Sequence, residues 1–460
     1  MYQIDFNKPE TIHFIGIGGI SMSGLAQILL EEGFRVSGSD AHKTQLTEHL
    51  EQMGAKIAYG QRASNITEDI DVVVYTAAIH PDNLEFQAVQ ERKIPMLTRA
   101  ELLGEMMRNY QNAVNIAGTH GKTTTTSMLT DILLAAGTDP TVTVGGILHD
   151  IGGNIRVGGA EYFVAEACEY TNSFLSFFPT MEIILNIEAD HLDFFKDLED
   201  IRHSFRLFAE KLDEKGILII NSDIQDVEAL VEGLPCQVVT FGRDPARSRY
   251  SAAAITYDQV GNGSYTLLID GAEAGQIQLH VPGEHNIYNS LSAVAAAMSF
   301  GIPLEKIQEG LLRFTGTERR FEKKGVVGGV TVIDDYAHHP QEIRATLAAA
   351  KRYPHKKLWC VFQPHTYTRT AALLDEFAEA LLEADEVVLA DIYAAREVNT
   401  IGISSADIAI KIAEAGGKAC YIPSFDEIET FLLKKCVPGD LLITMGAGDI
   451  VKVGERLLGK

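Results

Sequence analysis

AVNIAGTHGKTTTTSML, residues 113–129, decides the fold of the central part of this chain. Its apolar start is typical of a buried strand, and its end has the pattern of an amphipathic helix. The turn between them, GTHGKT (118–123), therefore lies where a phosphate-binding loop operates, although Ile116 stands where the full GxxxxGK[ST] pattern has its first glycine. Backbone amides of such a loop face phosphate oxygens, Lys122 would supply a point charge on them, and Thr123 would hold a magnesium ion.

Two later strand-like runs carry groups that could complete this site. Glu166 lies near the end of YFVAEA (162–167), and His191 follows EIILNI (182–187), which carries Asn186. Because parallel strands of one sheet present their carboxyl ends at the same edge, Glu166 and His191 should both face the phosphate loop. Taken singly, each would be assigned as a solvated loop residue. The shared edge makes them candidate magnesium ligands.

Short apolar runs alternate with helix-sized stretches along almost the whole chain, which predicts βαβ units and an α/β fold. A polar stretch at 101–112 and the turn-rich FTGTERRFEKKG (314–325) are the candidate joints. We predict three domains: a Rossmann-like domain at 1–108, a central phosphate-loop ATPase-like domain at 109–316 and a C-terminal Rossmann-like α/β domain at 317–460. Residues 251–282 alternate with period two between glycines, which predicts a small antiparallel sheet appended to the central domain.

Length and charge exclude several classes of protein. At 460 residues the chain is long enough for about two to four domains, so a single small binding module is excluded. Its 63 acidic and 39 basic side chains give a formal net charge of -24, and we expect no nucleic-acid or anionic-membrane partner. No apolar run reaches the about 18 residues of a membrane span, and the N-terminus is acidic where a signal peptide is basic. The five cysteines form no CxxC pair, so we expect a soluble cytoplasmic protein.

A second glycine-rich turn, GIGGIS (16–21), follows a strand-like run near the N-terminus. Asp40 ends the next strand-like run, 24 residues beyond Gly16, which is a Rossmann-like spacing for an acid that bonds a ribose hydroxyl. The glycines that would let the backbone approach a pyrophosphate are Gly16, Gly18 and Gly19. Ser21 replaces the third glycine of the fingerprint. A structural turn, a nicotinamide cofactor and a UDP-linked ligand are all compatible with this pattern.

Six ordered motifs give the chain a wider resemblance. They are GTHGKTTTT (118–126), EADHLDFF (188–195), GEHNIYNSLSA (283–293), ERRFE (318–322), DDYAHHP (334–340) and FQPHTYTRT (362–370). Together they resemble the Mur ligases of peptidoglycan precursor synthesis. The resemblance runs from the GIGG turn to GAGDI (446–450), which is essentially the whole chain.

The resemblance implies an ATP-dependent amide-bond-forming ligase with ATP and Mg²⁺ as cofactors. FQPHTYTRT is similar to the family member that joins L-alanine to the lactyl carboxylate of UDP-N-acetylmuramate through an acyl phosphate, releasing ADP and phosphate. Cell-wall biogenesis, cell shape and cell division would be the processes served, and we expect a monomer or a weak homodimer. The member that recycles muramoyl peptides is the nearest alternative. A nucleotide-binding dehydrogenase would explain GIGGIS and Asp40 but leaves the phosphate loop without a role.

The resemblance also implies roles for individual residues. ATP would be bound by Gly118, Thr119, His120, Gly121, Lys122, Thr123, Thr124, His285, Asn286, Asn289, Arg319, Arg320 and Asp335. The metal ligands would be Thr123, Glu166 and His191. The UDP-sugar would contact Gly16, Gly18, Gly19, Ser21, Asp40 and His120. L-Alanine would contact Tyr336, His338, His365 and Arg369. The catalytic residues would be Lys122, Glu166, His191, Arg320 and His338, with His338 one of several possible bases for the attacking amine.

Two departures limit this transfer. ACEYTNSF (167–174) follows Glu166 where other members carry a more acidic string, so no role is assigned to Glu169 or Asn172. FQPHTYTRT has Thr366 where many members have arginine, so the third-domain site has one cation fewer.

Overall fold

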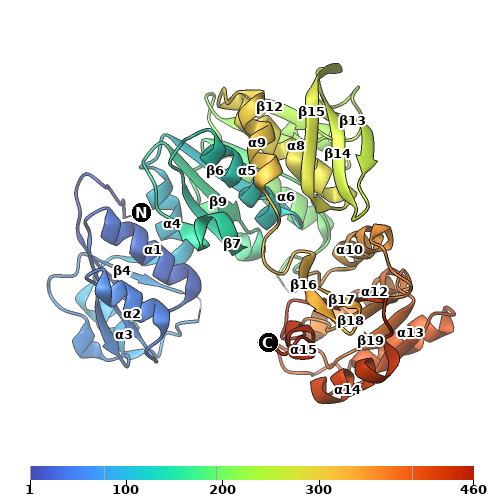
Figure 1. Ribbon diagram of the computed structural model, residues 1–460. Coiled ribbons are helices and arrows are strands. Elements are labelled where there is room, and N and C mark those ends of the chain that lie inside the picture. The colour runs from blue at the N-terminus through green and yellow to red at the C-terminus, as the bar shows by residue number, and fades with distance from the viewer. Residues whose placement is uncertain (1, 77, 193, 396) are drawn as a thin grey trace.

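The computed structural model describes residues 2–76, 78–192, 194–395 and 397–460. The described chain forms three α/β domains, each built on its own mostly parallel sheet, with the N-terminal and C-terminal domains attached to different parts of the middle one (Figure 1). The α/β class predicted from the alternating pattern is confirmed. Among the described residues, no helix has the length and apolar character needed to cross a membrane.

The N-terminal domain has a parallel sheet in the order β3-β2-β1-β4-β5, which is a Rossmann-like arrangement. Its elements are β1 (Thr11–Ile15), α1 (Ile20–Glu31), β2 (Arg35–Asp40), α2 (Gln45–Gln52), β3 (Lys56–Tyr59), η1 (Ala63–Asn65), β4 (Val72–Tyr75), α3 (Leu84–Arg92), β5 (Met96–Thr98) and α4 (Arg99–Met107). β1 is buried along its whole length. The glycine-rich turn follows β1 directly, at the carboxyl edge of the sheet where this fold binds nucleotides.

The middle domain has a mixed sheet in the order β15-β14-β13-β12-β11-β10-β6-β9-β7-β8. Its elements are β6 (Asn112–Ala117), α5 (Lys122–Ala135), β7 (Thr141–Leu148), η2 (His149–Ile151), β8 (Gly153–Arg156), β9 (Tyr162–Ala167), η3 (Tyr170–Ser176), β10 (Met181–Ile184), α6 (Leu198–Ala209), β11 (Ile217–Asn221), α7 (Val227–Val231), β12 (Gln237–Phe241), β13 (Tyr250–Tyr257), β14 (Asn262–Ile269), β15 (Ala272–Pro282), α8 (Glu284–Ser299) and α9 (Leu304–Arg313). The strands from β12 to β7 are parallel, whereas β13, β14 and β15 pair antiparallel. The antiparallel strands predicted within 251–282 are therefore confirmed.

The C-terminal domain has the sheet order β16-β17-β21-β18-β19-β20, parallel except at β16. Its elements are β16 (Glu322–Val327), β17 (Val330–Asp335), α10 (Pro340–Arg352), β18 (Leu358–Phe362), α11 (Tyr367–Ala372), α12 (Leu374–Leu381), β19 (Glu386–Leu389), α13 (Ser405–Glu414), β20 (Ala419–Tyr421), α14 (Phe425–Lys435), β21 (Leu441–Met445) and α15 (Val451–Leu457). The DDYAHHP and FQPHTYTRT motifs lie at the carboxyl ends of β17 and β18, so both reach the same edge of this sheet.

Helix α5 differs from the amphipathic helix predicted for it, because almost every residue after its first turn is buried. It packs between the sheet and the helices α8 and α9. Two of its hydroxyl side chains bond within the helix: Ser127 Oγ donates to the carbonyl of Thr123 at 2.8 Å, and Thr130 Oγ1 donates to that of Thr126 at 2.7 Å. The buried hydroxyls of Thr125 and Thr126 have no partner among the described residues, so backbone acceptors offset only part of the cost of burying this polar helix.

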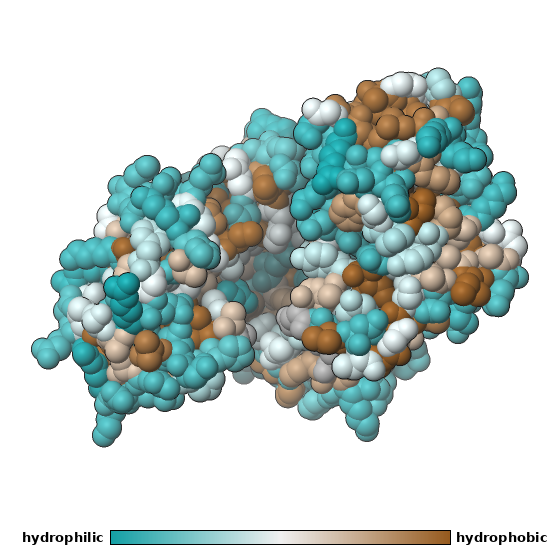
Figure 2. Space-filling view, turned by 90° about the horizontal axis from the view of Figure 1, so that it is seen from below, coloured by the Kyte–Doolittle hydropathy of each residue, from teal (hydrophilic) through white to brown (hydrophobic). Residues whose placement is uncertain are grey.

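The joint between the middle and C-terminal domains has a turn-rich backbone, with positive φ at Gly316 (106°), Arg319 (60°) and Phe321 (49°). The two domains also touch away from the joint, where Arg352 of α10 lies 3.7 Å from the ring centroid of Tyr257. A recess separates the N-terminal domain from the rest of the molecule in the view from below (Figure 2). The candidate site described next faces the boundary between the middle and C-terminal domains.

Candidate active site

The phosphate loop joins β6 to α5 and depends on its two glycines. Gly118 and Gly121 have φ angles of 142° and 87°, which residues with a side chain rarely adopt. A Cβ on Gly121 would lie 2.6 Å from the Asn289 side-chain oxygen, so the loop backbone packs directly against α8. The first amides of α5 have no partner within the helix, and they lie at the end of the loop where an anion would be bound.

Lys122 begins α5 and turns back over the loop. Its Nζ donates to the carbonyl oxygens of Gly118 and Thr119 and lies 3.3 Å from Glu169 Oε2. Burial alone would lower the pKa of this lysine, but the charges of Glu169 and Glu166 raise it above its ordinary value. The ammonium is therefore kept charged at the position where the sequence predicted a phosphate contact.

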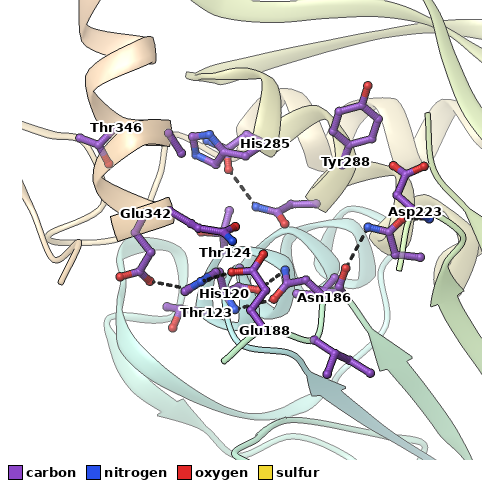
Figure 3. Close-up of a pocket in the computed structure, with 18 of the residues that line it drawn as sticks. His120, Thr123, Thr124, Asn186, Glu188, Asp223, His285, Tyr288, Glu342 and Thr346 are labelled. Atoms are coloured by element: carbon purple, nitrogen blue, oxygen red, sulfur yellow. Dashed lines mark hydrogen bonds and ion pairs between the residues drawn. The ribbon is translucent and has the colours of Figure 1, made fainter. Parts of the chain in front are cut away.

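A pocket of about 440 Å³ opens beside the loop, between the middle and C-terminal domains (Figure 3). The residues predicted to bind ATP that line it are His120, Gly121, Thr123, Thr124, His285, Asn286, Asn289, Arg320 and Asp335. Residues that sequence reasoning did not select also line it, among them Asn186, Glu188, Asp223, Arg243, Tyr288, Glu342 and Thr346. Its walls come from the phosphate loop, the first turn of α5, α8 and α10, so it is completed only when the two domains meet.

The wall formed by α8 holds its amide groups in fixed positions. Asn286 donates to the carbonyl of Pro282 at 2.7 Å, and Asn289 donates to the side-chain oxygen of Asn286 at 3.1 Å. Arg243 lies 4.9 Å from the ring centroid of Tyr288 on the same side of the pocket. An ordered amide pair beside an aromatic ring is suited to the edge and face of a planar base.

His120 lies between two carboxylates, one from each domain (Figure 3). Its Nε2 is 2.9 Å from Glu188 Oε2, and its Nδ1 is 3.2 Å from Glu342 Oε1. Burial would lower the pKa of His120, but Glu342 and Glu188 raise it to about 9. The loop itself is anchored by Asn186, whose side chain accepts from the His120 amide at 2.8 Å. His120 is thus a second cation of the loop, which its sequence position did not reveal.

The predicted metal ligands occupy one edge of the middle sheet. Thr123 is in the first turn of α5, Glu166 is near the end of β9, and His191 follows β10. Glu166 accepts a hydrogen bond from the Gly145 amide at 2.5 Å, and its charge acts on Lys122. Burial lowers the pKa of His191, so the ring is neutral and able to coordinate a metal. A hydroxyl, a carboxylate and a neutral imidazole at one edge are chemically suited to Mg²⁺ bound together with phosphate oxygens.

The four residues predicted to bind the amino acid come together at the carboxyl edge of the C-terminal sheet. The ring centroids of Tyr336 and His338 are 5.5 Å apart, and those of His338 and His365 are 5.8 Å apart. Arg369 Nη1 lies 3.3 Å from His365 Nδ1. A second pocket, of about 190 Å³, is lined by His365 and Arg369 together with Asp190 and His191 of the middle domain.

Arg369 makes an ion pair that sequence reasoning missed. Its Nε and Nη2 donate to Asp190 Oδ1 at 3.2 and 2.9 Å, and both side chains are about nine-tenths buried. Burial would raise the pKa of Asp190, but Arg369 and His191 hold it below its ordinary value. The arginine is therefore already bridged to the middle domain, with Nη1 on the side of His365.

The two adjacent arginines of the joint, Arg319 and Arg320, have different surroundings. Arg319 donates to Asp334 at 3.0 Å and to the carbonyl of Gly446 at 2.7 Å, so it is committed within the C-terminal domain. Arg320 lines the large pocket instead. Asp335 accepts from two backbone amides, and burial raises its pKa to about 6. Of the two arginines, Arg320 is the one placed to meet a ligand.

The first glycine-rich turn is tied to the next strand. Gly16 has a φ of 84°, and the Gly18 amide donates to Asp40 Oδ2 at 2.8 Å. Ser21 accepts from Arg99 at 3.2 Å, and Gly19 lies at the start of α1. Asp40 thus fixes the turn with one carboxylate oxygen, and the turn opens at the carboxyl edge of the sheet.

Three family models cover the described fold. The Mur ligase family catalytic-domain model matches residues 11–111, the Mur ligase middle-domain model matches 116–297, and the Mur ligase glutamate-ligase-domain model matches 319–448.

Curated relatives match along the full length. The chain is 65% identical over 458 residues to a UDP-N-acetylmuramate–L-alanine ligase of Lachnospira eligens and 59% identical over 460 residues to that of Agathobacter rectalis, with 100% of each chain covered. Among solved structures it resembles the UDP-N-acetylmuramate–alanine ligase of Thermotoga maritima (TM-score 0.79, 29% identity, 98% of both chains). It also resembles a murein peptide ligase of Psychrobacter arcticus (TM-score 0.69, 26% identity, 98% of both chains).

Proposed function

The chain belongs to the Mur ligase family, and from that premise we propose that it joins L-alanine to the lactyl carboxylate of UDP-N-acetylmuramate in peptidoglycan precursor synthesis, with cleavage of ATP to ADP and phosphate. The observation that carries the proposal is the pocket lined on one side by the phosphate loop, at His120, Gly121 and Thr123, and on the other by Asp335 and Glu342 of the third domain. High identity to alanine ligases favours this substrate pair over the muramoyl peptides of the recycling enzyme. A dehydrogenase would leave the loop and its pocket without a role.

The cations and backbone amides around the phosphate loop are suited to the activation of a carboxylate by ATP. A carboxylate is a poor electrophile, so the lactyl oxygen attacks the γ-phosphorus of ATP and forms an acyl phosphate while ADP leaves. Lys122 and the loop amides stabilise the charge on the transferred group, since phosphoryl transfer depends chiefly on positioning and electrostatics. Thr123, Glu166 and His191 would hold Mg²⁺, which neutralises phosphate charge when it is bound.

The second step forms the amide bond. The amine of L-alanine attacks the acyl carbon, phosphate leaves, and the amine loses a proton. Burial lowers the pKa of His338 to about 4, so its ring is neutral at pH 7 and has an acceptor nitrogen available, although it is a weak base. The two-domain pocket keeps water from the acyl phosphate, whose hydrolysis would waste ATP.

The N-terminal domain would hold the UDP moiety at the Gly16–Asp40 turn. The family assignment favours this ligand over a nicotinamide, and the turn and the phosphate loop belong to different domains, so the two nucleotides would have separate sites. The oligomeric state and the cellular location stay predictions.

Phosphate release from ATP tests the proposal. We expect release that requires UDP-N-acetylmuramate and is greatest with L-alanine among the amino acids, together with a product heavier than UDP-N-acetylmuramate by one alanine residue. Release that depends on a muramoyl peptide substrate instead of free L-alanine would assign the chain to the recycling activity.

A further inference from the structure

Glu342, on α10, is a carboxylate whose two oxygens face different sites. Its Oε1 lies 3.2 Å from His120 Nδ1 and 3.9 Å from Arg320 Nη1, on the side of the phosphate loop. Its Oε2 accepts from the backbone amides of His338 (2.9 Å) and His339 (3.2 Å) and lies 3.3 Å from His338 Nδ1. A single side chain therefore touches the loop of one domain and the amino-acid motif of the other.

The contact with the loop is an ion pair. Burial would raise the pKa of Glu342, but His338, His120 and Arg320 hold it well below its ordinary value. The side chains of His120 and Glu342 are only 17% and 12% exposed, so solvent screens their attraction weakly. The pair links the middle and C-terminal domains at the edge of the pocket (Figure 3).

The contact with His338 fixes the state of its ring. His338 Nδ1 lies 3.0 Å from the carbonyl of Tyr336 and 3.3 Å from Glu342 Oε2. Both neighbours are acceptors, so the neutral ring carries its proton on Nδ1, and Nε2 is the acceptor nitrogen. Glu342 and the Tyr336 carbonyl together set the orientation and the tautomer of a residue in the proposed amino-acid pocket.

A metal ion is a different explanation for the groups around His120. Among the described residues, His120, Glu188 and His339 have ligand atoms within 4.8 Å of one another, a donor set that suits zinc. However, His339 Nδ1 accepts from the Gln341 amide at 3.4 Å, which places the ring proton on Nε2. Nε2 in turn lies 3.2 Å from the carbonyl of Ala189 and offers no lone pair to a metal. The two ring protons of a His120 imidazolium, one toward Glu188 and one toward Glu342, account for this arrangement without a metal.

We propose that Glu342 is a positioning residue that couples the phosphate loop to the amino-acid pocket. The inference rests on the proposed function, which puts ATP at the loop and L-alanine beside His338. His120 holds Glu342 at the loop where ATP would be bound, and Glu342 holds α10 and the His338 ring in the arrangement that receives the amine. Loss of this carboxylate should therefore weaken the binding of L-alanine and make that binding less dependent on ATP. Binding of the UDP-linked substrate should not change.

Glu342→Gln tests the coupling. Glutamine also serves at the third position of a capping box, so the start of α10 should survive the change. We expect the KM for L-alanine to rise at least about tenfold, in line with the loss of a charge-assisted contact. ATP concentration should no longer affect that KM, and the KM for UDP-N-acetylmuramate should stay within about twofold of the wild-type value. The matched control is Glu379→Gln. It removes an exposed carboxylate of α12 that pairs with Arg344 of α10, the helix that carries Glu342. This change should leave the KM for L-alanine, the ATP dependence of that KM and the KM for UDP-N-acetylmuramate unchanged.

Nuclear magnetic resonance of the histidine ring of His120 tests the ion pair itself, whereas the ATP dependence of the alanine KM tests the coupling. The groups that face this ring from the surrounding elements are Glu188, His285, His339 and Glu342, and Arg320 lies 3.9 Å from the Glu342 oxygen that faces it. In the wild-type chain without substrates we expect its titration midpoint near 9, and in Glu342→Gln a midpoint lower by at least about one pH unit. The resonance of His120 is assigned as the one that disappears in the spectrum of His120→Asn. Glu342→Asp, which keeps the charge, should recover part of both effects.

The outcomes separate the two proposals. A wild-type chain that forms no alanyl product refutes the proposed function, while the His120 titration still tests the ion pair. An unchanged titration in Glu342→Gln, or a folded variant with an alanine KM within twofold of the wild type, overturns the coupling role of Glu342.

Discussion

Replacement of Lys122 by alanine separates the chemical role of the phosphate loop from its structural role. The Lys122 ammonium lies 3.3 Å from Glu169, and the two side chains are 17% and 3% exposed. Removal of one partner from a buried ion pair costs about 3–5 kcal/mol, because the other charge stays buried without it. Loss of one charge-stabilising contact in a water-poor site slows turnover by about 10²- to 10³-fold. Lys122→Ala should therefore lose both stability and activity.

A second substitution distinguishes the two losses. In Lys122→Ala/Glu169→Gln the uncompensated carboxylate is gone, so most of the lost stability should return. Turnover should stay low, because the cation that meets the phosphates is still missing. Urea unfolding and phosphate release measure the two quantities, and calorimetry should show unchanged binding of UDP-N-acetylmuramate, whose proposed site is in another domain.

Two results would refute this reasoning. Near-normal turnover by folded Lys122→Ala would remove the lysine from the chemistry. Recovery of turnover together with stability in the double variant would show that Lys122 acts only by neutralising Glu169.

Three further changes test other parts of the site. Gly18→Val would place its Cβ 2.8 Å from Asp40 Oδ2 and so displace the glycine-rich turn. Calorimetry should show binding of UDP-N-acetylmuramate weakened by about tenfold or more, with ATP affinity unchanged. Weakened ATP binding would mean that the first domain is misassigned. Arg369→Ala should raise the KM for L-alanine at least about tenfold through loss of charge-assisted hydrogen bonds worth about 1.5–3 kcal/mol. If initial rates show an unchanged KM in a folded variant, Arg369 does not bind the amino acid and serves only in its ion pair with the middle domain. Burial and Asp150 raise the pKa of Asp131 from 3.8 to about 8, so the folded chain binds the extra proton and loses stability as pH rises between these values. Asp131→Asn should therefore raise the urea midpoint at pH 8 and lose this advantage near pH 4, whereas an equal effect at both pH values would contradict the assignment.

Local patterns were sufficient for the fold and for much of the site. The GTHGKT turn, with a strand before it and a helix after it, predicted the phosphate loop, and the carboxyl edge of a parallel sheet predicted that Glu166 and His191 would lie near it. The period-two pattern at 251–282 predicted the antiparallel strands. These inferences need only the geometry of one sheet or one turn.

Contacts between domains could not be predicted in this way. Glu342 lies three residues beyond His339 of the DDYAHHP motif and four beyond His338, and this i, i+4 relation to His338 is a sequence signal that could have selected it. Its pairing with His120, however, depends on how α10 meets the phosphate loop. The Arg369–Asp190 ion pair likewise joins residues 179 positions apart. Buried α5 shows a further limit, because its threonines look polar in sequence, yet the helix is buried although only some of their hydroxyls, such as that of Thr130, bond to the helix backbone.

The charge pairs of the site explain how an acidic chain can bind polyanionic substrates. A lone cation buried beside the pocket would lose its proton or its stability, so Lys122 and His120 are each held by a carboxylate, as is Arg369. The cations are thereby charged and oriented before a nucleotide arrives, which lowers the cost of ordering them on binding. The same carboxylates repel phosphate, however, and this repulsion must be offset by positive charge that comes with ATP. A divalent cation held at Glu166 would supply that charge, so under the proposed function metal binding and phosphate binding would be electrostatically coupled at this site.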